Sequence, residues 1–464
     1  MALTKVSYSM ITGAQVNVLD YGADPTGVAN SSSAFTAAYA DAVAGGGEMF
    51  IPPGTYLGQF VFSGEAPVRG AGIRRTVLKP SNTASYCVRL YGIGGDANLG
   101  ATISNLSITS TTKTGKGLEC GDRAFTSGCS NALIERLEIS GFEENITLSM
   151  CLLSTFRQVY SYGGVYGIAF DGEANVTTLH FDSCRFRLND YGIYARTGLN
   201  VIWTNCNSES NVLVNLWLRT GLTNGPAEWI FNTCWFENIT GSSGSRYCIF
   251  LDMLSAIAAT KPMNVRFNYC TISAPETIPD VRADRAQDVI FDHCYFSSTP
   301  DAFTSAKFSY ATGTAAVRIR LLNCGQTQAV PTETMYASFP ALTRVSGGVF
   351  GFFYEFTQVN GKRFTNYEVL SASTVVTSLQ TAYATTLVCD TTSAGFDINS
   401  LNGGSDGQVL RIVKPVSANT LTIKNNGTGT EKILTASGAD VALTGREGIT
   451  LVCDGSSWYE SQYT

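Results

Sequence analysis

The sequence predicts an all-β chain built around a parallel β-helix of about nine turns, in which short strands stack along one axis. Three observations predict this fold. A short apolar signature recurs along the chain, the alternation of inward and outward residues shifts by one position inside each copy, and the fraction of charged residues is low. Charged residues make up 15% of the 464 residues, whereas 44% are hydrophobic and 11% are aromatic. Such a composition excludes a disordered chain and is typical of a sheet-rich fold with a large core.

The recurring signature consists of an apolar residue, two mostly polar residues, and then an apolar residue or cysteine. Its copies begin at Ile103, Ile134, Phe156, Phe181, Trp203, Phe231, Phe267, Phe291 and Leu321. The shortest interval occurs twice, from Ile134 to Phe156 and from Phe181 to Trp203, and the longer intervals leave room for loops. Self-similarity at such intervals is typical of a solenoid, in which each copy is one structural unit.

Each copy is expected to contain two short strands joined by a bend. Leu179 and Phe181 alternate with polar neighbours and therefore share one face of a strand. The next inward residues, Cys184 and Phe186, are shifted by one position. The chain must therefore bend at 182–183, where short polar residues tolerate left-handed backbone angles. A third strand is expected in many copies, at 165–168, 191–193, 214–216 and 247–249.

The chain has 13 cysteines, an odd number that fits poorly with a complete disulfide framework. The cysteines of the signature would form a ladder inside the coil, where free thiols pack like small apolar side chains. No two cysteines have the C-x-x-C spacing of a zinc site, so we expect core packing and neither a metal nor a cofactor. Free thiols in this number indicate folding in a reducing cytoplasm.

A helix is predicted before the first repeat, over residues 31–44. Its apolar residues recur at helical spacing: Phe35, Ala38, Tyr39, Ala42 and Val43. Asn30 or a following serine is the expected N-cap, and the glycines at 45–47 are the expected stop. Such a helix would cover the open end of the solenoid, because an unpaired strand edge invites aggregation.

The repeat stops near residue 330, and from about 371 short β-rich runs alternate with turn clusters. This pattern predicts a small C-terminal antiparallel β-sandwich, which would hold subunits together or bind glycan. We therefore divide the chain into a short N-terminal segment (1–15), the β-helix (16–330), a connecting segment (331–370) and the sandwich (371–464).

Composition and motifs also exclude some classes of function. No apolar run near the N-terminus has the form of a secretory signal, and no run of about 18 apolar residues predicts a membrane-spanning helix. Lys and Arg number 31 against 37 Asp and Glu, so the basic excess of a nucleic-acid-binding protein is missing. We therefore expect no nucleic-acid partner and no membrane insertion.

Several segments near the start follow one another in a fixed order: residues 16–27 (VNVLDYGADPTG), the predicted helix, the glycines at 45–47, residues 51–56 (IPPGTY) and residues 69–72 (RGAG). These segments and their order resemble the opening of the pectate-lyase-like superfamily, which includes polygalacturonase-like enzymes and many bacteriophage tailspikes. The first residues, MALTKVSYSMI, resemble the start of many phage tail proteins.

The resemblance implies a right-handed β-helix that assembles as a homotrimer in a virion tail. It implies action outside the host cell on a bacterial capsule or lipopolysaccharide O-antigen. The large head domain that anchors many tailspikes to the virion has no counterpart in the sequence. We therefore expect residues 1–15 to attach the chain to other tail proteins.

The register of the repeats predicts an outward column that carries carboxylates. Residues at equivalent positions of adjacent turns lie about 4.8 Å apart, and three residues past the signature cysteine stand Arg187, Glu209 and Glu237. Two carboxylates this close push one pKa up, which leaves one acid and one ionised group. Glycoside hydrolysis uses such pairs, about 5–5.5 Å apart in retaining and 6.5–9.5 Å in inverting enzymes. The alternative is a solvated ladder of charges that contributes little.

The third strand predicts a second outward column, an aromatic file beside alternating charges. Aromatic faces could pack against sugar rings, but such a stripe is also what a subunit interface would show. Two aspartates of this column, Asp171 and Asp252, are further catalytic candidates, although about 14 Å would separate them. The candidates for substrate binding are Arg187, Tyr194, Arg196, Trp217, Arg219, Trp235 and Phe250. Arg196 and Arg219 would bind an acidic sugar or pair with the two aspartates.

Three functions remain open from the sequence, and hydrolysis by the paired carboxylates is favoured among them. The first is a tailspike depolymerase that binds and hydrolyses a surface polysaccharide. The second is a receptor-binding fibre without catalysis, and the third is a lyase that removes the C5 proton of a uronate sugar. The only two histidines, His180 on a strand and His293 in a bend, are too isolated to form a site.

Overall fold

The computed structural model is nearly all-β and confirms the parallel β-helix. The residues that it describes are 15–92, 102–122, 128–170, 176–219, 225–240, 246–252, 264–275, 278, 280–284, 289–296, 308–309, 319–322, 325–326, 367–370, 379–380, 386–389, 391–392, 394–402, 404, 406–416 and 418–461. They form two compact units, of which the first comprises Met1–Arg282 with Tyr295–Thr299 and the second comprises Ala283–Cys294 with Pro300–Thr464.

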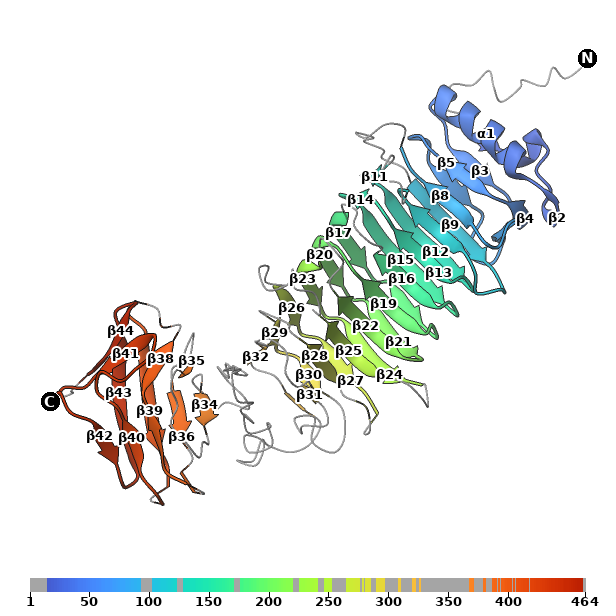
Figure 1. Ribbon diagram of the computed structural model, residues 1–464. Helices are drawn as coiled ribbons and strands as arrows, with labels where there is room; N and C mark the ends of the chain where they lie inside the picture. The colour runs from blue at the N-terminus through green and yellow to red at the C-terminus, as the bar shows by residue number, and fades with distance from the viewer. Residues whose placement is uncertain are drawn as a thin grey trace, which may run out of the picture. The chain divides into compact units, whose positions relative to one another are not determined.

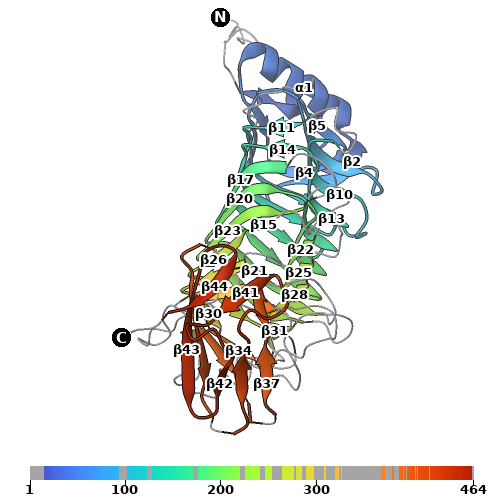
Figure 2. The ribbon, with the colours of Figure 1, turned by 60° about the vertical axis from the view of Figure 1, so that its left-hand side comes forward.

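The first unit is a coil of stacked parallel strands (Figure 1). One sheet contains β1 (Val16–Asn17), β2 (Thr26–Asn30), β3 (Met49–Ile51), β4 (Gly54–Gly58), β6 (Val68–Gly70), β7 (Thr76–Pro80), β9 (Thr102–Thr109), β11 (Cys129–Ser130), β12 (Leu133–Ser140), β14 (Cys151–Leu152), β15 (Thr155–Tyr162), β17 (Val176–Asp182), β18 (Arg185–Arg187), β20 (Leu199–Thr204), β21 (Asn207–Asn211), β23 (Ala227–Asn232), β24 (Trp235–Ile239), β26 (Val265–Asn268), β27 (Thr271–Ser273) and β30 (Tyr295–Phe296). A second sheet contains β5 (Phe60–Phe62), β8 (Tyr86–Leu90), β10 (Lys116–Cys120), β13 (Glu144–Leu148), β16 (Tyr166–Phe170), β19 (Tyr191–Ala195), β22 (Val214–Arg219) and β25 (Tyr247–Asp252). Successive strands of one face, such as β17, β20 and β23, lie one beyond the other along the coil (Figure 2).

The predicted bend between the first two strands of each turn is confirmed by the backbone angles. The third residue of the signature has a positive φ in eight copies: Asn105, Arg136, Gln158, Ser183, Asn205, Thr233, Tyr269 and His293. These φ values lie between 50° and 59°, in the left-handed region. The bend inferred at 182–183 therefore recurs from turn to turn. Even Arg and Tyr occupy this position, although the left-handed conformation is unfavourable for them.

Replacing Gln158 by glycine is expected to stabilise the protein by about 0.5 kcal/mol, because glycine adopts φ > 0 without the steric cost that other residues bear. Gln158 is exposed and has a φ of 54°, so no packing is lost. The matched variant Gln158→Val is expected to destabilise, since β-branched residues tolerate this region least. Urea unfolding of both variants measures the difference, and equal stabilities would contradict the assignment of strain to this position.

The interior of the coil contains a stack of aromatic rings, each contributed by the first residue of one signature copy. The rings are those of Phe156, Phe181, Trp203, Phe231 and Phe267, all fully buried. Successive ring centroids lie 4.7, 3.8, 5.8 and 4.8 Å apart, with interplanar angles of 16° or less. Register between turns thus places apolar residues distant in sequence directly over one another.

The predicted cysteine ladder is also present, formed by Cys184, Cys206, Cys234 and Cys270. Each thiol donates a hydrogen bond to the carbonyl oxygen two residues before it, at 3.4–3.5 Å. All cysteines among the described residues are free and buried, and those of the ladder pack in the core of the coil. Cys324, the last cysteine of the signature, lies outside the described residues.

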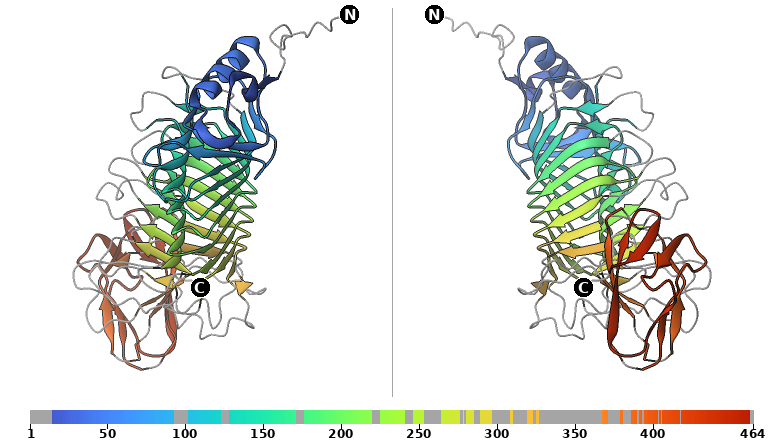
Figure 3. Two further views of the ribbon diagram at one scale, coloured as in Figure 1. Left: turned by 90° about the vertical axis from the view of Figure 1, so that its right-hand side faces the viewer. Right: turned by 90° about the vertical axis from the view of Figure 1, so that its left-hand side faces the viewer.

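Helix α1 (Ser32–Gly45) lies across the N-terminal end of the coil, where the sequence placed a capping helix (Figure 3). Phe35, Ala38, Tyr39 and Ala42 are buried, and the Phe35 ring lies 4.3 Å from that of Phe60 in β5. The N-cap is Ser31, and Gly46 ends the helix with a φ of 61°. Val43 differs from the prediction: it lies at the margin of the apolar face and is 45% exposed.

The second unit contains a β-sandwich near the C-terminus. An eight-stranded sheet joins β34 (Tyr367–Leu370), β36 (Thr386–Cys389), β39 (Val409–Lys414), β43 (Glu447–Cys453), β44 (Ser457–Glu460), β41 (Glu431–Leu434), β38 (Ser400–Asn402) and β35 (Leu379–Gln380) in that order. A three-stranded sheet joins β37 (Phe396–Ile398), β40 (Leu421–Ile423) and β42 (Val441–Leu443). The other described strands of this part are β28 (Val281–Asp284), β29 (Val289–Asp292), β31 (Phe308–Ser309), β32 (Ile319–Leu322) and β33 (Gly325–Gln326).

The sandwich prediction is confirmed, but the pairing of its strands is mixed rather than purely antiparallel. Strands β39 and β43 pair antiparallel, whereas β36 and β39 pair in parallel. The segment between β36 and β39 contains two further strands, and a crossover of this kind, unlike a tight hairpin, allows parallel pairing. Searching the described residues for a helix long and apolar enough to cross a membrane finds none.

Candidate functional site

Two columns of outward side chains run along the strands that follow each bend. Register pairs Tyr160, Arg185, Asn207, Trp235 and Thr271 in one column and Tyr162, Arg187, Glu209, Glu237 and Ser273 in the other. We call these ten residues the carboxylate face. The residues between them, Phe186, Ser208 and Phe236, are buried, so strand alternation directs the flanking side chains outward. The predicted neighbours Arg187, Glu209 and Glu237 are thus confirmed as register partners on successive turns.

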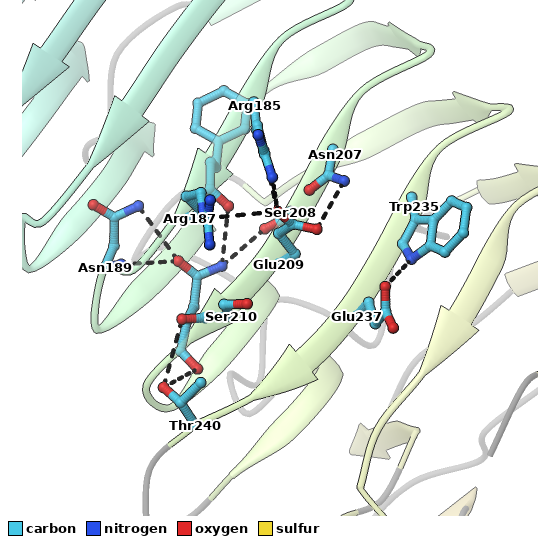
Figure 4. A network of polar contacts seen from close by, with 12 residues as sticks. Arg185, Arg187, Asn189, Asn207, Ser208, Glu209, Ser210, Trp235, Glu237 and Thr240 are labelled. Carbon is cyan, nitrogen blue, oxygen red and sulfur yellow. Dashed lines mark hydrogen bonds and ion pairs between the residues drawn. The ribbon is translucent and has the colours of Figure 1, made fainter.

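Glu209 is held by side chains from its own turn and from the preceding one (Figure 4). Its carboxylate accepts hydrogen bonds from Arg185 Nε at 3.1 Å and from Asn207 Nδ2 at 3.1 Å. Arg187 Nε lies 3.7 Å from the same Glu209 oxygen that accepts from Arg185. Burial acts to raise the pKa of Glu209, but the hydrogen bonds and the two guanidinium charges outweigh it and lower this pKa. Glu209 is therefore an ionised carboxylate at neutral pH.

Glu237 has a different partner, on its own strand. Its carboxylate accepts a hydrogen bond of 2.6 Å from Trp235 Nε1, and the Trp235 side chain is 47% exposed. Figure 4 shows the Glu209 carboxylate turned toward the arginines and the Glu237 carboxylate turned toward the indole. The two glutamates are neighbours in register, yet each is oriented by its own group.

Two polar atoms of the carboxylate face have unmade hydrogen bonds. Arg187 Nε and Asn207 Oδ1 are buried and have no hydrogen-bond partner within the part of the chain that the structure describes. Leaving a buried donor or acceptor unpaired costs about 1–3 kcal/mol. A ligand with hydroxyl groups would satisfy both atoms, because a hydroxyl can accept from Arg187 Nε and donate to Asn207 Oδ1.

The second predicted column forms an aromatic face on a different side of the coil. It comprises Tyr166, Tyr191, Tyr194, Trp217, Tyr247 and Phe250, and we call it the aromatic face. The register of Tyr194, Trp217 and Phe250 is as predicted, with ring centroids 5.1 and 5.6 Å apart along the file. Most of these rings are half-buried, so they cover one another and still present edges to solvent.

The charges beside the aromatic face are only partly brought together. Arg219 and Asp252 are register partners and form an ion pair of 4.0 Å, as one of the sequence alternatives expected. Asp252 is only 3% exposed, and the Arg219 guanidinium lies over the Trp217 ring. Arg196 Nε is buried without a hydrogen-bond partner among the described residues. Asp171 lies outside those residues.

The structure therefore divides the predicted residues between two faces. Arg187, Glu209, Glu237 and Trp235 belong to the carboxylate face on β18, β21 and β24, whereas the aromatic candidates belong to β19, β22 and β25. The turns of the chain between the two faces contain buried asparagines. Two of them, Asn189 and Asn211, are hydrogen bonded to each other.

Sequence reasoning missed Arg185 and Asn207, which orient Glu209, and the tyrosine pair of the preceding turn. The rings of Tyr160 and Tyr162 stack with centroids 4.8 Å apart. For Arg185 and Asn207 the signal was present, because each stands two positions from a predicted residue and strand alternation puts both on one face. His180 pairs with Thr204 Oγ1 at 3.2 Å, outside the carboxylate face.

Comparison with known proteins agrees with this architecture. Residues 15–272 match the model of the rhamnogalacturonase A/epimerase, pectate lyase-like family, and residues 368–459 match that of the phage depolymerase C-terminal β-sandwich domain. No curated protein matches the chain in sequence.

Among the solved structures that are similar in fold are an epimerase module and a phage tailspike. The A-module of the mannuronan C-5 epimerase AlgE4 from Azotobacter vinelandii has a TM-score of 0.50 and 16% identity, over 87% of this chain and 99% of the module. The gp42 tailspike of Acinetobacter phage vb_AbaP_AS12 has a TM-score of 0.50 and 10% identity, over 97% of this chain and 82% of the tailspike. The resemblance found in the opening motifs is thereby confirmed. With a family match over more than half of its length, the chain belongs to the rhamnogalacturonase A/epimerase, pectate lyase-like family.

Proposed function

We propose that this protein is a phage tailspike depolymerase that binds a bacterial surface polysaccharide and hydrolyses it at the carboxylate face. The observation that carries the proposal is the register that sets Glu209 beside Glu237, between two arginines and an exposed tryptophan. The C-terminal match to a phage depolymerase domain supports it. We further propose a homotrimer in the virion tail, attached to other tail proteins through residues 1–15.

The two glutamates would divide the chemistry between them. Glu209, ionised by its arginine partners, would act as the nucleophile or as the base that activates water. Glu237, which accepts a hydrogen bond from Trp235, would act as the general acid and protonate the leaving oxygen of a sugar stacked on that ring. Arg187 and Asn207 would donate to and accept from the sugar through their unmade hydrogen bonds.

A second candidate function is a lyase or related reaction that removes the C5 proton of a uronate sugar. The observation in its favour is the arginine pair, Arg185 and Arg187, in register with Tyr160 and Tyr162. Two guanidinium groups would neutralise the uronate carboxylate, and a tyrosine would exchange the proton. The similar fold of a mannuronan C-5 epimerase is consistent with such chemistry on this scaffold.

Incubation of the full chain with purified capsule or O-antigen from a strain that it binds separates these functions. Hydrolysis shortens the polysaccharide without a new double bond. Elimination shortens it with new ultraviolet absorption from an unsaturated sugar. Binding without shortening on any bound strain would overturn both and identify a receptor-binding fibre.

Replacing Arg185 by methionine is expected to move the acidic limb of the pH–activity profile to higher pH. Arg185 is a main cause of the lowered Glu209 pKa, so wild-type activity persists as pH falls until Glu209 is protonated at that lowered pKa. Without Arg185 the pKa rises and protonation occurs at a higher pH. Arg157→Met is the matched control, because Arg157 pairs with Glu135 across turns outside the carboxylate face. An unchanged acidic limb in Arg185→Met would contradict the role of Glu209.

We propose that the aromatic face is a separate binding surface for the same polysaccharide. Trp217→Ala is expected to weaken polysaccharide binding by about tenfold, in line with about 1–2 kcal/mol for a lost aromatic contact, without changing the oligomeric state. Binding to immobilised polysaccharide and light scattering measure the two properties. Dissociation of the oligomer in Trp217→Ala would instead assign this face to the subunit interface.

A further inference from the structure

Three thiols of the first unit meet at one point in its interior. Cys120 ends β10, Cys129 begins β11 and Cys151 begins β14, and their sulfur atoms all lie within 4.8 Å of one another. Cys129 and Cys151 are register partners on neighbouring turns, whereas Cys120 reaches them from the second sheet. Each of the three is at most 1% exposed.

This cluster differs from the cysteine ladder, which has the same residue type in the same core. Each ladder thiol donates to backbone carbonyls of its own and of the preceding turn, as Cys206 does to Thr204 and Phe181. Among the described residues, the three clustered thiols make no such hydrogen bond to a carbonyl, and their sulfur atoms lie close to one another.

The geometry suits coordination by three sulfurs. Because the three sulfur atoms lie within 4.8 Å of one another, a point between them is about 2.8 Å or less from each sulfur. A small rotation of each side chain would shorten this distance to about 2.3 Å, the length of a metal–sulfur bond. Ser149, whose backbone N–H donates to the Cys120 carbonyl, has a fully buried hydroxyl without a hydrogen-bond partner among the described residues.

We propose that Cys120, Cys129 and Cys151 form a buried site for monovalent copper, a soft cation. Thiolate sulfur selects soft metals, and closed zinc sites use four ligands, whereas this cluster offers three sulfurs and includes no histidine or carboxylate within the described part of the chain. The cation replaces thiol protons and ties β10, β11 and β14 together. Spacing along the chain predicted no metal site, but the coil brings together thiols that are far apart in sequence.

Burial sets the kinetics of this site. Because all three sulfurs are inaccessible in the folded chain, the cation enters while the coil forms and leaves only when these turns open locally. Copper added during folding is therefore retained through desalting with a chelator, whereas copper added to folded apoprotein is taken up slowly.

The test is to refold the full chain without oxygen in the presence of the copper(I)–acetonitrile complex, and then to desalt it with a chelator. We expect one copper per chain and an X-ray absorption spectrum with three sulfur neighbours at about 2.3 Å. Cys129→Ala is expected to lose the copper, and Cys206→Ala, a ladder thiol of similar burial, is expected to keep it.

The proposal would be overturned if the wild-type protein lost its copper on desalting, or if the spectrum showed nitrogen or oxygen neighbours around the copper. Retention of copper by Cys129→Ala would overturn it as well. So would a disulfide between two of the three cysteines in the natively purified protein, detected by mass spectrometry. If Cys129→Ala does not fold, the number of sulfur neighbours in the wild-type spectrum decides alone: three supports the site, and fewer overturns it.

Discussion

Glu237→Gln is expected to lower the rate of polysaccharide cleavage by about 1,000-fold, the contribution of a positioned general acid, while leaving binding and fold intact. Glutamine can still accept the hydrogen bond from Trp235 Nε1 but cannot deliver a proton to the leaving oxygen. Release of new reducing ends measures the rate, and retention on immobilised polysaccharide measures binding.

Glu209→Gln is expected to abolish cleavage as well, because the amide supplies neither a nucleophile nor a base. The matched control for both variants is Glu135→Gln. Glu135 also pairs with an arginine on the neighbouring turn and has a pKa lowered by it, but it lies outside the carboxylate face. Full activity in Glu209→Gln or Glu237→Gln, or equal loss in Glu135→Gln, would contradict the assignment of the catalytic pair.

Trp203→Ala is expected to lower the free energy of unfolding by about 4 kcal/mol, the cost of a large cavity in a packed core. The Trp203 ring is fully buried and stacks 3.8 Å from Phe181 and 5.8 Å from Phe231, so the deletion interrupts the aromatic stack along the coil. Chemical denaturation with intrinsic fluorescence measures the loss.

Trp235→Ala provides the control for this prediction, because Trp235 belongs to the same sheet and is 47% exposed. We expect it to cost less than about 1 kcal/mol, as is usual for surface positions. Equal destabilisation by the two variants would show that the aromatic stack does not dominate the stability of the coil.

The fold was predictable because each turn repeats one local pattern. The parity break at Phe181 and Cys184 fixed the bend, and the left-handed backbone at Ser183 recurs at the same signature position in other copies. Once the bend is fixed, counting along the strand gives the register, so the neighbours Glu209 and Glu237 followed without side-chain information.

Side-chain direction could not be predicted in the same way. The turn of Glu209 toward Arg185 depends on rotamers and on the charge of the preceding turn, which strand counting does not supply. The thiol cluster was missed for a related reason: Cys120 lies on the third strand of its turn, so it shares no signature position with Cys129 or Cys151.

Several charged residues in the described part of the chain form pairs that cross from one turn to the next. Arg89 pairs with Glu119, Glu135 with Arg157, and Arg185 with Glu209, each on register-related strands. Glu209 is one of these carboxylates and lies within ion-pair distance of both Arg185 and Arg187.

The most direct test of the central claim is a crystal structure of Glu237→Gln soaked with an oligosaccharide of the host polysaccharide. We predict that a sugar ring stacks on Trp235, that its glycosidic oxygen lies within hydrogen-bond distance of residue 237, and that Arg187 and Asn207 bind its polar groups. An oligosaccharide bound only at the aromatic face, with the carboxylate face empty, would contradict the proposed site of cleavage.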